Sequence, residues 1–227
     1  MKRAALIIFL VLLIDQVVKI WVKTHMYLGE EHHIVGNWFI VHFTENYGMA
    51  FGLEFGGHFG KFFLSIFRII ASAGIGWYLI HLIKHKAHAG AIVSFALIFA
   101  GAIGNIIDSA FYGLIFSDSE QQMSTLFPAG GGYAGFLQGR VVDMLYFPII
   151  HGHFPAWFPL WGSEDFLFFR PVFNISDSSI SIGVFLLLLF HKKFFPQETA
   201  PSPIVEENQP GEPTVSDNES VTNLQIH

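Results

Sequence analysis

Four stretches of the chain are apolar over about 20 residues, the length that an α-helix needs to cross the hydrocarbon core of a bilayer. They lie at 4–22, 62–83, 90–112 and 174–191. Apolar runs of this length predict transmembrane helices. The pattern therefore predicts four membrane spans, with the two longest connections at 23–61 and 113–173.

The first stretch, "MKRAALIIFLVLLIDQVVKIWV", has the basic start and the apolar run of a signal peptide. No small-residue cleavage site follows it, and the apolar pattern resumes after Asp15. We therefore interpret it as a retained first span.

Basic residues predict how the spans are oriented. Pairs of them precede the first span, separate the second from the third, and follow the fourth: Lys2 and Arg3, Lys84 and Lys86, Lys192 and Lys193. If four spans alternate, all three pairs fall on one side, which the positive-inside rule assigns to the cytoplasm. Both termini are then cytoplasmic, and the two long connections are outside.

The outer connections contain some regular structure. "NWFIVHF" (37–43) is rich in β-forming residues and precedes the turn-like "ENYGMAFG", which predicts a small sheet. Residues 117–139 read as a long loop with Gly-rich character, and 148–169 are rich in aromatic residues and proline. The expected fold is therefore an all-α membrane protein of four transmembrane helices with a small extracytoplasmic β-subdomain.

Composition supports a membrane protein. Hydrophobic residues make up 52% of the 227 residues, charged residues only 13%, and the mean hydropathy is +0.48. Residues 196–227 hold six of the 18 acidic residues and neither Lys nor Arg, so the rest of the chain has 12 acids and 12 bases. We expect a membrane domain at 1–195 and a disordered acidic cytoplasmic tail at 196–227. No basic surface for nucleic acid is predicted. The absence of Cys excludes disulfides and thiolate chemistry.

Charged and amide side chains gather at the outer ends of the predicted spans. They are Asp15 and Lys19 in the first span, Asn105 and Asp108 in the third, Asn174 and Asp177 at the mouth of the fourth, and Asp143 in the outer connection. An ionisable residue in a membrane segment is costly and usually serves a function. Four carboxylates at one level therefore predict a site there.

Structural roles would also explain several of these residues. The i,i+4 spacing of Asp15 and Lys19 suits an ion pair within one helix. Asn174 suits the N-cap of the fourth span, and the helix macrodipole favours Asp177 in its first turn. Lys61 and Arg68, near the outer start of the second span, are expected to extend toward the headgroups.

Two carboxylates that meet have a specific chemistry. They share one proton, so that the ionised member can deprotonate water while the protonated member polarises a carbonyl group. Such an aspartic peptidase needs no metal, Ser or Cys. The chain has no G-x-S-x-G and no H-E-x-x-H, and His151 and His153 form only a weak H-x-H metal motif. Spacing alone does not establish that Asp143 and Asp177 meet.

Five motifs, in this order, resemble those of bacterial lipoprotein signal peptidase (signal peptidase II). They are "DQVVKIWV" (15–22), "FTENYGMAFG" (43–52), "AGAIGNIID" (100–108), "GRVVDM" (139–144) and "FNISDSSI" (173–180). The resemblance implies four transmembrane helices, an extracytoplasmic β-cradle and a short amphipathic helix. It also implies removal of signal peptides from prolipoproteins, on the amino side of a diacylglyceryl-modified Cys, at the outer face of the bacterial inner membrane.

The same resemblance assigns roles to single residues. It implies that Asp143 and Asp177 are the catalytic pair. Positions that orient this pair or bind the substrate would be Asn46, Gly48, Asn105, Asp108, Arg140 and Asn174, with Asp15 and Lys19 as structural support. It further implies a monomer without a cofactor, surrounded by membrane lipid and inhibited by cyclic antibiotics of the globomycin type.

The chain departs from the family pattern at two positions beside the site. Ser109 stands where the pattern usually has an Arg after the third-span Asp, and Ser176 stands where it has an Ala. Arg140 and Arg170 are candidates to supply the missing cation. Residues 117–139 and 148–169 also look longer than is usual for the family.

Three other functions remain open from the sequence. One is a transporter or proton relay that uses Asp15, Asp108 and Lys19, although four spans without an internal repeat argue against it. A second is a homologue that binds lipoprotein without cutting it. The third is a metalloenzyme that uses His151 and His153, which a chelator would inhibit.

Overall fold

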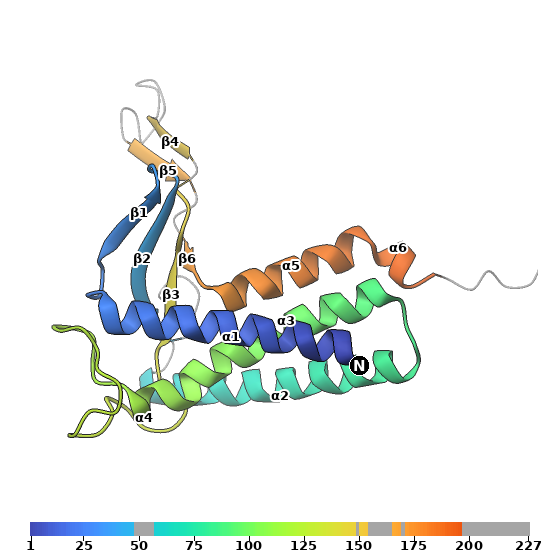
Figure 1. Ribbon diagram of the computed structural model, residues 1–227, viewed down its shortest axis with the longest axis horizontal. Helices are drawn as coiled ribbons and strands as arrows, with labels where there is room; N and C mark the ends of the chain where they lie inside the picture. Colours follow the sequence, from blue (N-terminus) through green and yellow to red (C-terminus); the bar gives the residue numbers. More distant parts are fainter. Residues whose placement is uncertain (48–56, 149, 154–164, 169–170, 197–227) are drawn as a thin grey trace, which may run out of the picture. The chain divides into compact units, whose positions relative to one another are not determined.

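The computed structural model describes residues 1–47, 57–148, 150–153, 165–168 and 171–196 of the 227-residue chain. Its helices are α1 (Lys2–His25), α2 (Gly57–Lys84), α3 (Ala89–Ile107), α4 (Gly113–Ile115), α5 (Ile175–Leu189) and α6 (His191–Phe194). A π-helical turn, η2 (Asp108–Tyr112), continues α3 into α4 (Figure 1). The predicted tail, from residue 197 on, lies outside the described residues.

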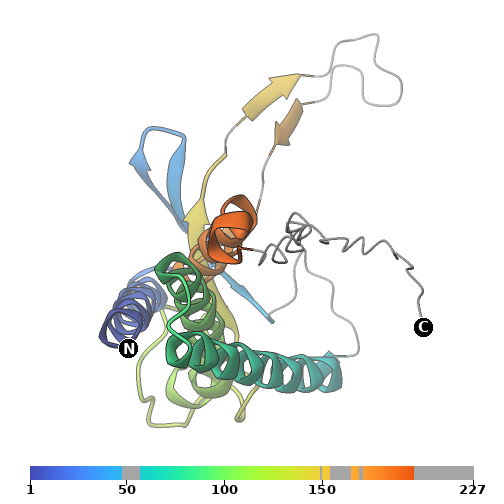
Figure 2. The ribbon, with the colours of Figure 1, turned by 90° about the vertical axis from the view of Figure 1, so that its right-hand side faces the viewer.

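A four-stranded antiparallel sheet lies where α1 ends and η2 begins (Figure 1). Its strands, in spatial order, are β1 (Glu31–Val35), β2 (Phe39–Asn46), β3 (Val141–Tyr146) and β6 (Val172–Phe173). A separate pair, β4 (Ile150–His153) and β5 (Asp165–Phe168), extends from the end of β3 and leads back to β6 (Figure 2). The predicted small sheet is thereby confirmed.

Asp143 lies on a β-strand rather than in a loop, because β3 pairs with β2, with a register shift between Val41 and Thr44. In the register of the two strands, Thr44 lies opposite Asp143 and Asn46 lies opposite Val141. The sheet therefore brings Asn46 and Asp143, almost 100 residues apart in sequence, onto neighbouring strands.

Among the residues that the structure describes, three helical segments are long and apolar enough to cross a membrane: Lys2–His25, Gly60–Lys84 and Ala89–Ile115. They match the first three predicted spans and extend beyond each of them at both ends. The fourth apolar helix, α5, has 15 residues and ends before residue 191, where the polar "HKK" begins. At 1.5 Å per residue it is about 22 Å long, less than the roughly 30 Å of a typical hydrocarbon core. The count of four spans stays a prediction.

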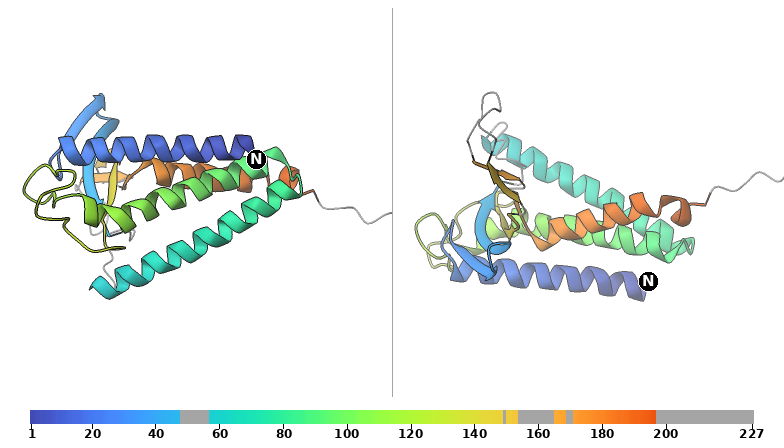
Figure 3. Two further views of the ribbon diagram at one scale, coloured as in Figure 1. Left: turned by 60° about the horizontal axis from the view of Figure 1, so that its bottom comes forward. Right: turned by 90° about the horizontal axis from the view of Figure 1, so that it is seen from above.

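The three basic pairs lie at one end of the helices, opposite the four-stranded sheet. Ala4, which follows the first pair, packs in one cluster with Leu79 near the end of α2. Leu82 and Phe194, which flank the other two pairs, pack in a second cluster. The N-terminus, the turn between α2 and α3, and α6 accordingly meet in Figure 3. This placement is the one that the alternating-span prediction requires.

Helix α3 contacts α1, α2 and α5, and its contact with α5 is the most extensive of the three. A Cβ atom at Gly101 would lie 2.2 Å from the backbone oxygen of Ser176, and one at Gly104 would lie 2.0 Å from its hydroxyl. Only glycine leaves room for such contact. The first turn of α5 is thereby held directly against the end of α3, where Asn105 and Asp108 lie.

A hydrophobic core joins the sheet to the helix ends. It contains buried side chains from α1, β2, β3 and the η2–α4 region, namely Val22, Met26, Phe43, Tyr112, Phe116, Val142 and Met144. Because β3 packs against α1 and η2 through this core, the position of Asp143 relative to both is fixed.

We expect Gly101→Ala to lower the thermal stability of the protein. The added methyl group would meet a backbone atom of α5, and forcing an extra methyl into a packed interior costs roughly 1–3 kcal/mol. Gly74→Ala on α2 is the matched control, because a Cβ atom there meets nothing within 4 Å. Thermal unfolding in detergent measures both, and equal unfolding temperatures for the two variants would contradict the proposed close packing of α3 on α5.

Candidate active site

Asn174 and Asp177 close the N-terminus of α5 through a reciprocal pair of hydrogen bonds. The backbone amide of Asp177 donates to Asn174 Oδ1 over 2.8 Å, and the backbone amide of Asn174 donates to Asp177 Oδ2 over 3.4 Å. This is a capping box, which satisfies amide groups that the first turn would otherwise leave unpaired. The predicted capping role of Asn174 is confirmed.

Asp143 receives a hydrogen bond from an amide group on each side of its carboxyl group. Asn174 Nδ2 donates to Asp143 Oδ1 over 2.7 Å, and Asn46 Nδ2, from the neighbouring strand, makes a short hydrogen bond to Oδ2. The Asp143 side chain is almost completely buried. The structure thus brings Asn46, Asp143 and Asn174 together, as the motifs predict.

Asn105 links the two acids from α3. Its Nδ2 donates to Asp177 Oδ1 over 2.7 Å, while its Oδ1 accepts from Asn174 Nδ2 and from Lys19 Nζ, each over 3.1 Å. These two donors fix the orientation of the amide, because its oxygen must face them and its nitrogen must face Asp177. Asp143 and Asp177 are therefore joined through Asn174 and Asn105.

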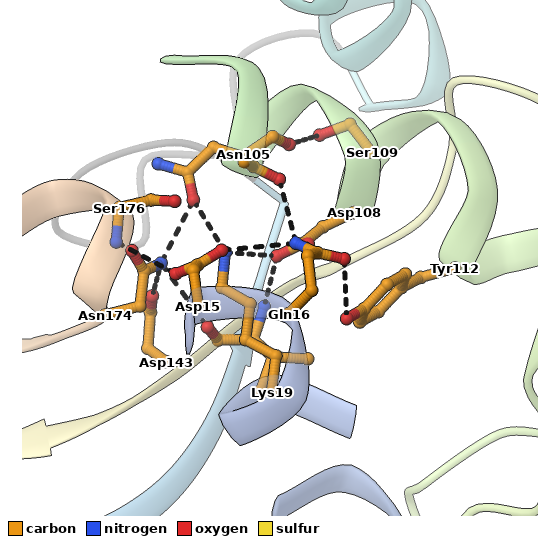
Figure 4. Close-up of polar contacts among 12 residues, drawn as sticks. Asp15, Gln16, Lys19, Asn105, Asp108, Ser109, Tyr112, Asp143, Asn174 and Ser176 are labelled. Carbon is orange, nitrogen blue, oxygen red and sulfur yellow. Dashed lines mark hydrogen bonds and ion pairs between the residues drawn. The ribbon is translucent and has the colours of Figure 1, made fainter. Parts of the chain in front are cut away.

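The Lys19 ammonium group lies between two carboxylates, and all three side chains are fully buried (Figure 4). It is 2.9 Å from Asp15 Oδ2 and 2.8 Å from Asp108 Oδ2. Asp15 Oδ1 accepts from the backbone amide of Ser176 over 2.9 Å, and Asp108 Oδ2 accepts from that of Val142 over 3.3 Å. Each acid therefore holds the residue immediately before one of the two candidate catalytic aspartates.

Gln16 and Tyr112 belong to this cluster, although the sequence analysis did not single them out. Gln16 Nε2 donates to Asp15 over 3.1 Å and to Asp108 over 3.0 Å, and Tyr112 donates to Gln16 Oε1 over 3.2 Å (Figure 4). Gln16 follows Asp15 directly in "DQVVK", and Tyr112 lies one turn beyond Asp108. The sequence did contain a signal for Gln16, namely its amide side chain directly beside Asp15, an acid within a predicted span.

Burial, and after it the negative charge of Asp177, raise the pKa of Asp143 to about 7 against the opposing hydrogen bonds from Asn174 and Asn46. A carboxyl group with this pKa holds its proton near neutral pH. Two acids of which one is protonated and the other ionised form the arrangement that general acid–base chemistry requires.

Arg140 is engaged with acids other than the Asp143–Asp177 pair. In the described part of the chain, the ion pairs of its guanidinium group go to Glu45, Asp118 and Glu120, over 3.1, 3.1 and 3.4 Å. Burial alone would lower the pKa of Arg140, but hydrogen bonds to Asp118 and Glu45 raise it. The expectation that Arg140 orients the pair is therefore not supported by a contact. Gly48 and Arg170 lie outside the described residues.

Glu45 also connects this outer cluster to the first helix. Lys23 makes a short ion pair with Glu45, and its ammonium group donates to Ser119 Oγ over 2.7 Å. The long 117–139 segment is thereby attached to α1 and β2, one residue away from Asn46.

Among the described residues, no group of three or more His, Cys, Asp or Glu side chains is arranged to hold a metal ion. His151 and His153 lie on β4, opposite Leu167 and Asp165 of β5.

A family model described as "Signal peptidase (SPase) II" matches residues 7–193 of the chain. A lipoprotein signal peptidase of Porphyromonas gingivalis is 51% identical over 215 residues, which cover 92% of this chain and 93% of that one. One of Amoebophilus asiaticus is 39% identical over 186 residues, or 81% of this chain and 75% of that one.

Two solved structures of a bacterial membrane enzyme resemble the fold, each with a TM-score of 0.56. The first is 23% identical and covers 89% of this chain and 96% of that one. The second is 25% identical and covers 85% and 94%. With a match to the family model along most of its length and a 51% identical relative, the chain belongs to the signal peptidase II family.

Proposed function

We propose that this protein is a membrane aspartic endopeptidase that removes signal peptides from diacylglyceryl-modified prolipoproteins, cutting on the amino side of the lipidated Cys. Membership of the signal peptidase II family makes the chain a peptidase. The observation that carries the catalytic assignment is the hydrogen-bonded chain from Asp143 through Asn174 and Asn105 to Asp177.

In the proposed reaction the two acids hold one proton between them. Asp177 takes the ionised role, because it lies in the first turn of α5, where the helix macrodipole favours a negative charge, and accepts hydrogen bonds from Asn105 and from the Asn174 backbone. Asp143 keeps the proton. Asp177 then deprotonates a water molecule, and Asp143 donates a hydrogen bond to the scissile carbonyl group. The leaving amine receives its proton from the pair.

The Lys19 cluster acts in this proposal through position. Asp15 holds the backbone before Asp177, and Asp108 holds the backbone before Asp143. Both acids are already in contact with the Lys19 ammonium group. Because the charges of Asp15, Asp108 and Lys19 neutralise one another, a structural role is favoured over the transporter or proton relay that the sequence left open.

We further propose four membrane spans, with α5 as the fourth, in the bacterial inner membrane. The three basic pairs at one end support cytoplasmic termini. The acid pair, near the opposite ends of the helices, then faces the periplasm, where a lipid-anchored Cys would present its peptide bond. We expect a monomer, and we expect globomycin-type cyclic antibiotics to compete with the substrate at the acid pair.

Asp143→Asn and Asp177→Asn should each abolish cleavage of a diacylglyceryl-modified prolipoprotein by the purified protein, because an amide can neither donate nor accept the required proton. EDTA should leave the wild-type rate unchanged. Ser176→Ala is the matched control: the Ser176 hydroxyl is buried and has no hydrogen-bond partner among the described residues, so its removal should leave cleavage intact. Normal cleavage by either folded Asn variant, or inhibition by EDTA, would refute the proposed pair.

The rate of cleavage should depend on pH as a bell-shaped curve. It should decline above about pH 7, where Asp143 loses its proton, and at low pH, where the second acid takes one up. Measurement of kcat/KM in detergent between pH 4 and 9 checks this, and a rate that rises steadily with pH would contradict it.

The free energy of unfolding of the wild type should fall as the pH rises, because of the ionisation of Asp143. Its pKa in the folded protein, about 7, lies above the ordinary value of 3.8. The unfolded chain therefore releases this proton first, and the stabilising contribution is lost between about pH 4 and 7. Because Asp143→Asn has no such proton, its unfolding temperature relative to the wild type should rise across that interval.

Lys19→Met should destabilise the fold and abolish cleavage. It leaves the Asp15 and Asp108 carboxylates buried without their cation, a change that typically costs about 3–5 kcal/mol. Adding Asp15→Asn and Asp108→Asn should recover much of the unfolding temperature. Lys84→Met, at the other end of the bundle, is the control. Wild-type stability and cleavage in Lys19→Met would show that the cluster does not position the acid pair.

A further inference from the structure

Residues 117–139 leave α4 and return along the same end of the helices before the chain enters β3 (Figure 1). Hydrogen bonds attach their backbone to the preceding helical turns. The donors are the amides of Phe127, Tyr133, Ala134, Leu137 and Gly139, and the acceptors are the carbonyl oxygens of Ile115, Phe116, Gly113, Ala110 and Ser109, in that order. Carbonyl groups in the last turn of a helix have no partner within it. The segment 117–139 therefore satisfies the end of the third apolar helix and lies directly against it.

Helix α2 holds the last residues of the same segment. Lys61 Nζ donates to the carbonyl oxygen of Gln138 over 2.6 Å, and Ser65 Oγ donates to that of Leu137 over 3.2 Å. Both donor side chains are buried. The expectation that Lys61 extends toward the headgroups is therefore wrong, and the segment is fixed from α2 as well as from the end of α3.

The side chains of this segment are distributed in the reverse of the way that water favours. Ser119 and Ser124 are almost fully buried, and each has a hydrogen-bond partner inside the protein. Two large apolar side chains are exposed instead, Phe127 to 73% and Phe136 to 57%. A large exposed apolar surface marks a site of contact with a membrane or with another protein.

The exposed part of the segment has a polar and an apolar portion. Glu120, Gln121 and Gln122 are consecutive, and all three are exposed. Residues 121–139 contain no Asp, Glu, Lys, Arg or His. Among them the exposed large hydrophobic side chains are Met123, Leu126, Phe127 and Phe136. The polar portion suits water, whereas the apolar portion suits an environment without it.

The apolar portion continues the exposed surface of the helix against which it lies. Phe111 and Leu114 belong to the helical segment Ala89–Ile115, which is long and apolar enough to cross a membrane, and both side chains are exposed. The ring of Phe136 packs edge-on against that of Phe111, with 6.0 Å between the ring centroids. In a membrane protein, exposed apolar side chains of a spanning helix contact lipid. The segment therefore extends a surface that faces lipid.

We propose that Leu126, Phe127 and Phe136 form an interfacial anchor, which inserts among the lipids of the leaflet at the sheet end of the helices, while Gln121 and Gln122 stay in water. Lipid is favoured over a protein partner because the anchor is continuous with the exposed face of a membrane helix. The inference goes beyond the proposed peptidase function, since it requires only that Ala89–Ile115 crosses the membrane.

Backbone hydrogen bonding limits how deeply the anchor lies. Irregular backbone that faces lipid is not found within the hydrocarbon core, because its unpaired amide and carbonyl groups would be too costly there. The amide of Phe127 is paired with Ile115, at the very end of the helical segment, over 2.7 Å. The anchor accordingly lies at the boundary between headgroups and acyl chains, as interfacial segments do.

The test uses the absence of Cys from the chain, because a single introduced Cys then carries a nitroxide spin label at one chosen position. Phe127→Cys and Phe136→Cys report on the anchor. Gln121→Cys is the control for water, and Ile70→Cys, at an exposed position of α2, is the control for lipid. Each labelled protein is reconstituted in vesicles of phosphatidylethanolamine and phosphatidylglycerol. Electron paramagnetic resonance then measures collisions with oxygen, which concentrates in lipid, and with a water-soluble nickel chelate.

We expect the ratio of oxygen to nickel collisions at positions 127 and 136 to exceed that at position 121 by about fivefold or more, because an interfacial anchor is buried about 5–10 Å into the boundary. Position 70 should give a higher ratio still. Thermal unfolding in detergent checks that each variant folds. If Phe136→Cys does not fold, because the contact with Phe111 is lost, Leu126→Cys reports on the same surface.

A label at position 127 or at position 136 that meets the nickel chelate as readily as the label at position 121 would overturn the proposal. A label that meets neither reagent would also overturn it, because protein rather than lipid would then cover the surface. Cleavage of prolipoprotein by the unlabelled wild type tests the proposed function separately, and its outcome does not alter the collision ratios.

Discussion

The Lys19 ammonium group is the point on which the arrangement of the site depends. Burying such a group costs several kcal/mol, which only close opposite charges and hydrogen bonds offset. Lys19 receives them from Asp15, Asp108 and Asn105. Because Asp15 and Asp108 each bind a backbone amide next to a candidate catalytic aspartate, one buried cation connects α1 and η2 with the start of α5 and with β3.

Local sequence pattern was sufficient to predict the first three apolar helices and β2. It also predicted that the acids gather near one end of the helices. It also indicated the ion pair of Asp15 with Lys19, because i,i+4 spacing is a property of a single helix. The link between Asp143 and Asp177 through Asn174 and Asn105 could not be predicted from pattern, since it depends on the pairing of β2 with β3 and on the contact of α3 with α5. Lys61 was misinterpreted for a similar reason: spacing places a base on a helix face, whereas packing decides whether that face meets lipid or protein.

Asn174 shows that a structural explanation and a functional one can apply to the same atoms. Its side-chain oxygen closes α5, and its nitrogen binds both Asp143 and Asn105. The oxygen is committed to the helix, so the amide cannot rotate, and the nitrogen must face the acid pair. Helix capping is in this case the means by which a functional group is oriented, and the two interpretations that the sequence left open are compatible.

Gly101 and Gly104 of α3 place unequal limits on how the sequence can change in evolution. Every substitution of glycine adds at least one carbon atom. At position 104 the nearest obstacles are side-chain atoms, the Ser176 hydroxyl at 2.0 Å and Asp15 Oδ2 at 2.9 Å, so a smaller residue at position 176 removes the nearer one and leaves the Asp15 carboxylate to shift. At position 101 the obstacle is a backbone oxygen, which every residue type possesses. Positions 104 and 176 can therefore vary together among related chains, whereas position 101 has no partner whose replacement would permit a larger residue.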